Sequence, residues 1–598
     1  MSAPIKTNQL TYTFDKELFS KNYDIFCIRT SEKHFKNGAY IIDATLLSNN
    51  VCSVLFKSGR EIFVLMKSNG SNKSLLKNAI LKEDGADRIT ISQVTPNSLK
   101  DDIVFQLMLN SLGNYESPLL KFNNLTGHLY CFHPNWLIRG RKSEADVVFK
   151  VPCLELRLSS EFRLNMEVHT FTSELLRNKI EFKKKKFDEY PKYIFSAHNT
   201  LRRKLKDDVG YSFIMRQTKN AKTEIAFLDI QNIDRFNQSK MGILTTVLEN
   251  FNDRFSSIAH LDFESITDYK ALDYTRSVAN ENKQAISDLL SIKPIKIVDC
   301  IDDEYSKIFC KEICDLLLSK YGIKTSCGKR VAKDHLNIRV IHNAAFYADS
   351  DDPHRIFNDV AVQHITFEDF SECSEFAIST VIHEMLIKAD LVKQKISLFD
   401  WNTLGLKDDI DFGIEVTDEQ NTKYIFMTIH PDGTFNISEQ TLNLFETNKY
   451  NQCVEIFENA KMNSVKVHGI IRDALGNINI IKDTEWFTIP EIYSIKAELA
   501  NGNTKLRGKE KRNELLSSCL DIKMFNDGVS EYYFVGTIGN GMRWLINRAA
   551  NIRKIEPFED SILMFDKLLP LMNVTFVHNG QLTIIPFPFK YLREHLNK

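Results

Sequence analysis

The sequence predicts a multidomain α/β protein, and three observations lead to that fold class. The chain has 598 residues, which is too long for one ordinary hydrophobic core, so we expect three or four domains. Its N-terminal quarter alternates short apolar and polar stretches with turn residues, as strands do. Between residues 294 and 405, strand-like stretches alternate with amphipathic stretches of helical length, which predicts a largely parallel sheet.

Residues 1–150 are expected to form a β-rich N-terminal domain, and residues 151–293 a linker region. Strands are predicted in the first domain at 39–44, 51–56 and 61–66, with a loop at 68–72. In the linker region, strands are predicted at 154–158, 164–168 and 225–229, and an amphipathic helix at 243–255.

Residues 294–405 and 406–598 are expected to form two further domains. In the first, strands are predicted at 295–298, 338–341 and 360–365, and helices at 304–320 and 375–389, with Gly322 as a C-cap. In the second, strands are predicted at 412–416, 424–429, 465–471, 478–481 and 532–535. The turn at 431–433 indicates a hairpin, and a helix is expected after Pro588.

Composition excludes several classes of protein. Hydrophobic residues make up 43% and charged residues 26%, which are values of a globular chain. No apolar run approaches the roughly 18 residues of a membrane-spanning helix, and the polar start lacks the apolar core of a secretory signal. The eleven cysteines contain no Cys-x-x-Cys spacing, which favours reduced thiols. We therefore expect a cytoplasmic protein that does not contact a membrane.

Charge is unevenly distributed along the chain. The net charge is −1, yet residues 177–206 hold eleven Lys and Arg against three Asp and Glu, so this window carries +8 and the rest −9. Tyr190, Tyr193 and Phe195 are interleaved with these cations. Such a window is typical of a surface that binds a polyanion, although a solvated charged face would show the same pattern.

Three motifs occur in order in the last third of the chain: residues 412–417 (FGIEVT), 469–473 (GIIRD) and 586–593 (PFPFKYLR). They resemble the opening strand, the later Arg-Asp strand and the C-terminal motif of the PIWI domain of the Argonaute family. The resemblance implies an Argonaute-like architecture with a Rossmann-like MID domain at 294–405 and an RNase H-like PIWI domain at 406–598. Too little sequence lies between 206 and 294 for a clear PAZ domain, so PAZ is expected to be absent or vestigial.

The resemblance places three degenerate catalytic positions at Glu415, Asp473 and Arg593. RNase H-like nucleases hold two divalent metals with carboxylates. Asp473 matches this pattern, but Glu415 is one methylene longer than the Asp of the family, and the Arg593 guanidinium cannot bind a metal. The loop Glu of the family has two candidates, Glu439 and Glu446. We therefore expect a PIWI domain that does not cut and holds no catalytic metal.

The resemblance also implies a pocket for the 5′ phosphate of a guide strand. Gln363 and Lys388 match the family's Gln and second Lys in spacing, whereas Glu384 stands at the first Lys position. Lys307 and Lys311 form an i, i+4 pair that could point at one phosphate. Solvated lysines on helix faces are the alternative for each residue. The cofactor expectation is none, or Mg²⁺ at the guide 5′ end.

The resemblance implies a function for the basic window at residues 177–206. Its cations would line the channel for the guide–target duplex and contact the nucleic-acid backbone. A helix predicted after Gly541 would add further cations, among them Arg553 and Lys554. The candidate channel residues are Lys183, Lys184, Lys185, Lys186, Arg202, Arg203, Lys204, Arg543 and Arg548.

The function implied is guided recognition of complementary nucleic acid without slicing. The expected partners are a short 5′-phosphorylated guide, DNA being favoured, complementary target DNA from an invading plasmid or phage, and a separate helicase–nuclease effector of the DdmD type. Two alternatives stay open. One is an active metal-dependent guided nuclease that uses Glu415, Asp473 and a further acid. The other is a guide-channel interaction subunit of a split Argonaute complex.

Overall fold

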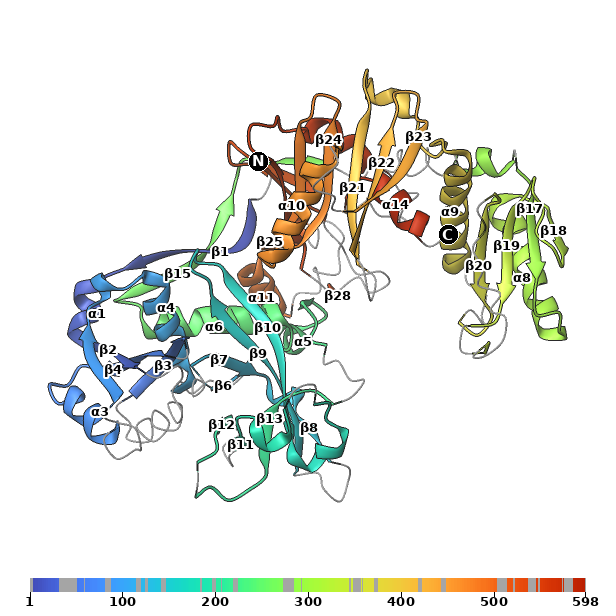
Figure 1. The fold of residues 1–598 in the computed structure, drawn as a ribbon. Helices are drawn as coiled ribbons and strands as arrows, with labels where there is room; N and C mark the ends of the chain where they lie inside the picture. Colours follow the sequence, from blue (N-terminus) through green and yellow to red (C-terminus); the bar gives the residue numbers. More distant parts are fainter. Residues whose placement is uncertain are drawn as a thin grey trace. The chain divides into compact units, whose positions relative to one another are not determined.

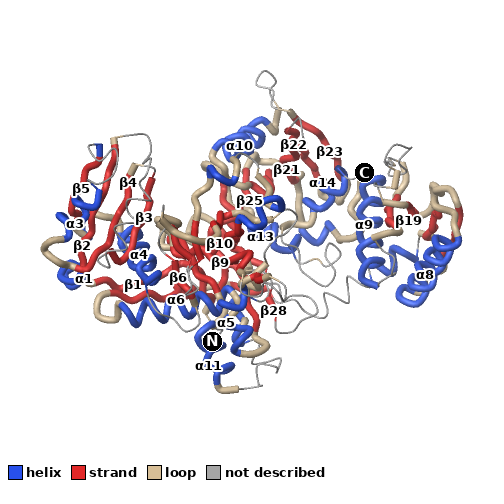
Figure 2. Tube along the Cα trace, turned by 90° about the horizontal axis from the view of Figure 1, so that it is seen from below, coloured by secondary structure: helices blue, strands red, loops and turns tan. Residues whose placement is uncertain are grey.

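The computed structural model of the chain divides into two compact units. Unit 1 consists of Met1–Thr267, Glu485–Leu520 and Thr537–Ala550, and unit 2 of Asp268–Thr484, Asp521–Gly536 and Asn551–Lys598. The structure describes residues 4–31, 51–58, 60–80, 88–114, 120–123, 127–140, 147–182, 185–195, 201–205, 207–218, 224–272, 284, 286–291, 293–343, 346–347, 357, 359–369, 375–417, 422–441, 448–502, 514–519, 522–535, 545–546, 549–572, 574 and 585–596. Both units mix helices and strands (Figure 1 and Figure 2), which confirms the predicted α/β multidomain class.

The N-terminal part of unit 1 contains a four-stranded antiparallel sheet. Its strand order is β3-β4-β2-β5, made of β2 (Tyr23–Thr30), β3 (Val51–Ser58), β4 (Glu61–Lys67) and β5 (Ile89–Val94). Helix α3 (Asn72–Ile80) packs Leu76 and Ile80 against one face of this sheet. The predicted strands at 51–56 and 61–66 are confirmed, whereas the strand predicted at 39–44 lies outside the described residues.

A second sheet of unit 1 is centred on two long antiparallel strands, β9 (Val148–Leu158) and β10 (Leu164–Ser173). The other strands are β6 (Lys121–Asn123), β7 (Leu129–Phe132), β8 (Ile138–Arg139), β11 (Tyr193–Phe195), β12 (Leu201–Arg203) and β13 (Ser212–Met215). Apolar side chains of β9 share one core with α4 (Asp101–Asn110) and α6 (Lys240–Arg254). The domain boundary predicted at residue 150 thus falls inside β9.

Unit 2 contains a four-stranded sheet in which every strand pair is parallel, as predicted. Its elements are β17 (Ile295–Asp299), α8 (Glu304–Tyr321), β18 (Thr325–Gly328), β19 (Leu336–Ile341), β20 (Val362–Thr366) and α9 (Glu375–Lys393). The strand order is β18-β17-β19-β20; α8 packs on β17 and β18, and α9 on β19 and β20. Gly322 ends α8 with φ 69°, the left-handed conformation that a C-cap requires.

The larger sheet of unit 2 runs in the order β16-β26-β27-β29-β25-β24-β21-β22-β23. The strands on this path are β16 (Lys270–Leu272), β21 (Ile410–Thr417), β22 (Thr422–Ile429), β23 (Phe435–Gln440), β24 (Val467–Asp473), β25 (Ile478–Ile489), β26 (Ile522–Asn526), β27 (Glu531–Val535) and β29 (Asn551–Pro557). Off the path, β1 (Ile5–Phe14) pairs with β15 (Ala259–Ile266) and with the end of β25. The predicted hairpin turn joins β22 to β23. From residue 485 onward, β25 belongs to unit 1.

Two helices cover this sheet, α10 (Asn451–Met462) on one face and α14 (Pro588–Leu596) on the other (Figure 1). Two motif glycines are needed because aromatic rings pack directly on the backbone there. A Cβ on Gly413 would lie 2.4 Å from the Phe426 ring, and one on Gly469 would lie 2.3 Å from the Phe589 ring. The motifs recognised in the sequence are therefore packing positions of this sheet.

The prediction of a helix after Gly541 is wrong. The described residues there form two strands, β28 (Leu545–Ile546) and β29, and β29 pairs with β27. Ile552 and Ile555 are buried, a three-residue spacing that suits a helix as well as an irregular strand, so pairing with β27 decides the conformation. The strand predicted at 225–229 is also shorter, because β14 (Leu228–Asp229) pairs with the two residues of β28.

Among the described residues, no helix is both long and apolar enough to span a membrane.

Candidate functional site

A cluster of charged and amide side chains forms where β20, α9 and α14 meet in unit 2. Gln363 Nε2 donates a hydrogen bond to Glu384 Oε2 at 2.8 Å. On α14, Lys590 Nζ lies 3.6 Å from Glu384 Oε1 and 2.7 Å from Glu594 Oε1. Lys388, one turn after Glu384 on α9, is only 8% exposed and interacts electrostatically with both glutamates. The structure thus brings together Gln363 and Lys388, the pair predicted from spacing, around Glu384.

The tyrosine of the C-terminal motif holds α14 against α9. Tyr591 is fully buried, and its hydroxyl donates to Asp390 Oδ2 at 2.7 Å. Asp390 also accepts hydrogen bonds from the backbone N–H and the hydroxyl of Ser397. These contacts bring Lys590 and Glu594, an i, i+4 pair on α14, next to Glu384 and Lys388, an i, i+4 pair on α9. Sequence reasoning missed Lys590 and Glu594, although both lie within or beside the motif that indicated this helix.

Burial perturbs the charges of the cluster. Burial, followed by repulsion from Glu594, raises the pKa of Glu384. Burial lowers the pKa of Lys388, against the attraction of the two glutamates. With ordinary charges, two lysines and two glutamates sum to zero. The cluster is therefore neutral, and burial favours the uncharged forms of Glu384 and Lys388. A ligand with concentrated negative charge would compete with the glutamates for the two ammonium groups.

A phosphate fits this donor set better than a resident Mg²⁺ does. Lys388, Lys590 and the Gln363 amide are donors, which is the chemistry that a phosphate needs. The buried oxygen without a hydrogen-bond partner in the cluster is Gln363 Oε1, and two ammonium groups nearby would repel a cation. The residues present therefore do not make a Mg²⁺ site by themselves.

Lys307 and Lys311 are not part of this cluster. Both are exposed on α8, and Lys307 Nζ lies 3.5 Å from Asp302 Oδ1. Lys307 is in the first turn of a helix that starts at the carboxyl end of β17, whereas Lys388 is about 20 Å along a helix that follows the carboxyl end of β20. Since the strands are parallel, Lys307 lies toward the carboxyl ends of the strands and Lys388 toward their amino ends.

The degenerate PIWI positions do not converge on one metal site. On the β21–β24 pair, Asp473 is directly opposite Ile410, so Glu415 is five residues, or about 17 Å, farther along β21. The two carboxylates also face opposite sides, because Ile410 packs on the α14 side and Glu415 is opposite Tyr424 on the α10 side. A single metal cannot contact both groups, so the pair required by the nuclease alternative is not assembled.

Asp473 and Glu415 each have local partners. Asp473 Oδ1 accepts backbone N–H groups of Leu475 at 3.0 Å and Asn477 at 2.9 Å, which closes the turn between β24 and β25. Glu415 Oε1 lies 3.5 Å from Lys461 Nζ. Arg593 is on α14 and exposed. Of the two candidates for the loop Glu, Glu439 pairs with Lys423, and Glu446 lies outside the described residues.

The sequence reasoning missed a buried charge network at the start of β21. Asp411 is 3% exposed, and its carboxylate accepts hydrogen bonds from four groups. These donors are Thr428 Oγ1 at 2.6 Å, Lys449 Nζ at 2.9 Å, Tyr450 OH at 3.2 Å and Arg472 NH1 at 3.1 Å. The Arg of the Arg-Asp motif thus neutralises a buried aspartate. The signal was an acidic residue two positions before the motif glycine, at an inward position of an apolar strand.

The basic window is only partly free to bind a ligand. Arg202 makes two 2.6 Å hydrogen bonds to the Asp208 carboxylate, and Lys204 Nζ donates to Gly210 O at 2.7 Å. Arg203 lies over the Tyr193 ring at 5.5 Å. These three cations hold the β11–β13 region together, and Tyr193 is buried.

Within the described part of the window, Lys185 and Lys186 are exposed and make no ion pair. Lys183, Lys184, Arg543 and Arg548 lie outside the described residues. Arg553 and Lys554, expected on a helix, are on β29 and pair with Asp483 at 3.2 Å and Glu556 at 2.8 Å. Lys185 and Lys186 are therefore the described candidates for contact with a polyanion.

No family model and no curated protein sequence matches this chain. Among solved structures, the chain is similar to Marinitoga piezophila Argonaute in complex with a 5′ OH guide RNA and target DNA, with 10% identity over 98% of this chain and 97% of that chain and a TM-score of 0.41. It is also similar to Drosophila Piwi, with 10% identity, coverage of 99% and 96%, and a TM-score of 0.41. For A. aeolicus Argonaute the identity is 9%, the coverage 100% and 98%, and the TM-score 0.36.

These solved structures are Argonaute and Piwi proteins, aligned along nearly the whole chain. Because the identities and TM-scores are low, the function proposed below depends on the residues of this chain and their contacts.

Proposed function

We propose that this protein binds the 5′ phosphate of a short guide strand at the cluster of Gln363, Lys388 and Lys590, and pairs the guide with complementary nucleic acid. The observation that carries the proposal is the meeting of Gln363 and Lys388 around one carboxylate, Glu384, at the junction of three elements. Their spacing in the sequence and the Argonaute-like motifs had already indicated this pair.

The guide phosphate takes the place of Glu384 as the partner of the two ammonium groups. A terminal phosphate carries more charge than a carboxylate and offers three acceptor oxygens, so it can engage both lysines and the Gln363 amide together. Burial raises the pKa of Glu384, so this carboxylate can take up a proton and lose its negative charge when the phosphate binds. A guide that lacks the phosphate has no charged group at its 5′ end that could replace Glu384 as the partner of the two lysines.

The protein binds its target without cutting it. The separation of Glu415 and Asp473 by register and by sheet face supports this proposal, as does a guanidinium at position 593. Asp473 is occupied as a turn cap, which is a structural task.

A guide protein that does not cut requires a separate effector. The motifs, the expected absence of a PAZ domain and the degenerate catalytic positions together resemble DdmE, the Argonaute of the DdmDE plasmid-defence system. On that resemblance we propose a DNA guide, a target in invading plasmid or phage DNA, and recruitment of a helicase–nuclease similar to DdmD.

The test is binding of four labelled oligonucleotides of one sequence: DNA and RNA, each with a 5′ phosphate or a 5′ hydroxyl. We expect tighter binding of the 5′-phosphorylated strands, and the preference should disappear in Gln363→Ala/Lys388→Ala. Lys393→Ala is the matched control, because Lys393 is an exposed lysine on the same helix. Sequencing of strands that copurify with the protein identifies the natural guide.

Two results would overturn the proposal. A protein that carries no short strands and ignores the 5′ phosphate would favour the interaction subunit of a split complex. Cleavage of a guided target in Mg²⁺ or Mn²⁺ that Asp473→Ala abolishes would favour the nuclease alternative.

A further inference from the structure

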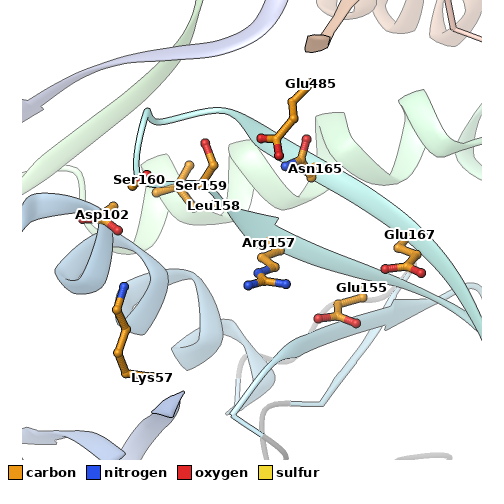
Figure 3. Close-up of a pocket in the computed structure, with 10 residues that line it drawn as sticks. All are labelled: Lys57, Asp102, Glu155, Arg157, Leu158, Ser159, Ser160, Asn165, Glu167 and Glu485. Atoms are coloured by element: carbon orange, nitrogen blue, oxygen red, sulfur yellow. The ribbon is translucent and has the colours of Figure 1, made fainter. Parts of the chain in front are cut away.

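A second group of polar side chains lies in unit 1, on one face of the strand pair β9–β10, and shares no residue with the proposed guide site. Glu155 on β9 is directly opposite Glu167 on β10, and His169 is two residues farther along β10 on the same face. Figure 3 shows Glu155 and Glu167 side by side on the neighbouring strands, next to Arg157. The antiparallel register therefore brings two carboxylates and an imidazole to one point.

The distances within this group are those of ligands around an ion. His169 Nε2 lies 2.8 Å from Glu155 Oε2 and 3.6 Å from Glu167 Oε2, and one ligand atom from each residue lies within 4.8 Å of the others. Among the described residues, no other set of three His, Cys, Asp or Glu side chains meets this condition. Around a tetrahedral Zn²⁺ with bonds of about 2.1 Å, ligand atoms are about 3.4 Å apart, so both distances from His169 Nε2 are within roughly 0.6 Å of that separation.

The orientation of His169 supports an ion rather than a simple hydrogen bond. Its Nε2 is buried and makes no hydrogen bond of acceptable geometry, although a carboxylate oxygen is 2.8 Å away. The oxygen therefore lies off the direction in which the ring N–H would donate. Two ligands of one metal face each other in this way, because both lone pairs point to a third position.

A further imidazole holds the most buried carboxylate. His128 Nδ1 lies 2.7 Å from Glu155 Oε1, the oxygen that does not face His169. Glu155 is 8% exposed, whereas the Glu167 side chain is 77% exposed. The site thus has one buried ligand, Glu155, which an outer partner fixes, and one half-buried ligand, His169. The third ligand, Glu167, lies at the rim of a cavity of about 450 Å³ that Glu155, Arg157 and Glu167 help to line.

We propose that Glu155, Glu167 and His169 bind one Zn²⁺ ion and that His128 orients Glu155 for it. Two carboxylates supply the two negative charges that balance the ion, and neutral imidazole is a preferred zinc ligand. Three protein ligands leave a position for water or for a small anion from the cavity. Binding releases a proton from any protonated His169 and ties β9 to β10. This site is independent of the guide-binding function proposed above.

The experiment is Zn²⁺ binding to the full chain after treatment with a chelator, measured by equilibrium dialysis and metal analysis. We compare the wild type with His169→Ala and Glu167→Gln. Wild type should bind one more Zn²⁺ per chain than either variant, and its melting temperature should rise with Zn²⁺ more than theirs does. His128→Ala should keep the site but weaken it about 10- to 100-fold, as outer partners do.

Glu161→Gln is the matched control, because Glu161 is an exposed glutamate between β9 and β10 that pairs with Arg163 instead. It should bind Zn²⁺ like the wild type. Co²⁺ provides a spectroscopic check, since ligation by this site gives visible bands without the thiolate charge-transfer absorption of a cysteine site. Because Glu167 is exposed, Glu167→Gln should fold normally, which its melting temperature without metal checks.

Equal Zn²⁺ binding by wild type, Glu167→Gln and His169→Ala would overturn the proposal, and so would no binding by the wild type. In either case the group is an ion-pair cluster only.

Discussion

Glu384→Gln is the substitution that separates a phosphate site from a structural ion-pair cluster. Glutamine keeps the shape of the side chain and can still bond to Gln363, whose Nε2 is 2.8 Å from Glu384 Oε2. The change removes the anion that lies 3.6 Å from Lys590 Nζ and offsets the charge of Lys388. If a guide phosphate competes with this carboxylate, its removal strengthens binding of the phosphate.

The size of the effect follows from the charges. A carboxylate and one phosphate charge about 5 Å apart repel by about 3 kcal/mol at an effective dielectric constant of about 20. The Glu384 side chain is 26% exposed, and salt screens part of this repulsion, so about half of it should remain. A gain of about 1.4 kcal/mol corresponds to binding that is about tenfold tighter.

The gain should depend on pH in a defined direction. Burial, followed by repulsion from Glu594, raises the pKa of Glu384, so a growing fraction of the wild type is already protonated as the pH falls. The advantage of Glu384→Gln should therefore be largest near pH 8 and shrink toward pH 5.

The assay is fluorescence anisotropy with one DNA strand carrying either a 5′ phosphate or a 5′ hydroxyl. Glu384→Gln should tighten binding of the phosphorylated strand only. Glu312→Gln, an exposed glutamate on α8, is the charge-matched control and should change neither. If Glu384→Gln leaves the ratio of the two affinities unchanged or lowers it, the cluster is structural and the reasoning fails.

Three further predictions concern other charges. Arg472→Leu leaves Asp411 buried with one cation fewer and should lower the free energy of unfolding in urea by about 3 kcal/mol, against a smaller loss for Arg472→Lys. Lys185→Ala and Lys186→Ala should each reduce the slope of log Kd against log salt by about 0.7–0.9 for a bound strand, and an unchanged slope would remove both from the channel. Burial raises the pKa of Glu556, but hydrogen bonds from two lysines outweigh it and lower that pKa below its ordinary 4.5. The stability from these ion pairs is present above pH 4.5 and lost as the pH falls through the lowered pKa. Glu556→Gln should therefore be less stable than the wild type above pH 4.5, and its free energy of unfolding should fall less than that of the wild type on acidification.

Much of the fold could be predicted because its signals are local. Helix α8 follows an apolar spacing of three and four residues and ends at a glycine that accepts φ 69°. The parallel sheet follows from strands separated by helices, since such connections leave little other topology. Where the local signal was ambiguous, as at Ile552 and Ile555, pairing with a distant strand decided the structure.

The candidate site divides in the same way. The resemblance to the Argonaute family indicated Gln363 and Lys388, because their spacing matches two positions of that family on a strand and a helix that the sequence predicts. It did not indicate Lys590 and Glu594, whose relevance depends on the bond from Tyr591 to Asp390, 201 residues away. The resemblance also grouped Glu415 and Asp473 as degenerate catalytic positions, which the nuclease alternative would use together, and the strand register separates them onto two faces of the sheet.

The sequence by itself determined the fold class, the order of most elements and the presence of glycines where aromatic rings approach the backbone. These properties depend on periodicity, turn residues and side-chain volume, which act over a few neighbouring residues. Only the tertiary structure decided which charges meet: Glu384 with Lys590, Asp411 with Arg472, and Glu155 with His169. A charge interacts over a few ångströms in any direction, so its partners are set by the packing of whole elements. For the two pairs on strands, Asp411 with Arg472 and Glu155 with His169, a shift of one residue in strand register would turn the side chains of the shifted strand to the other face.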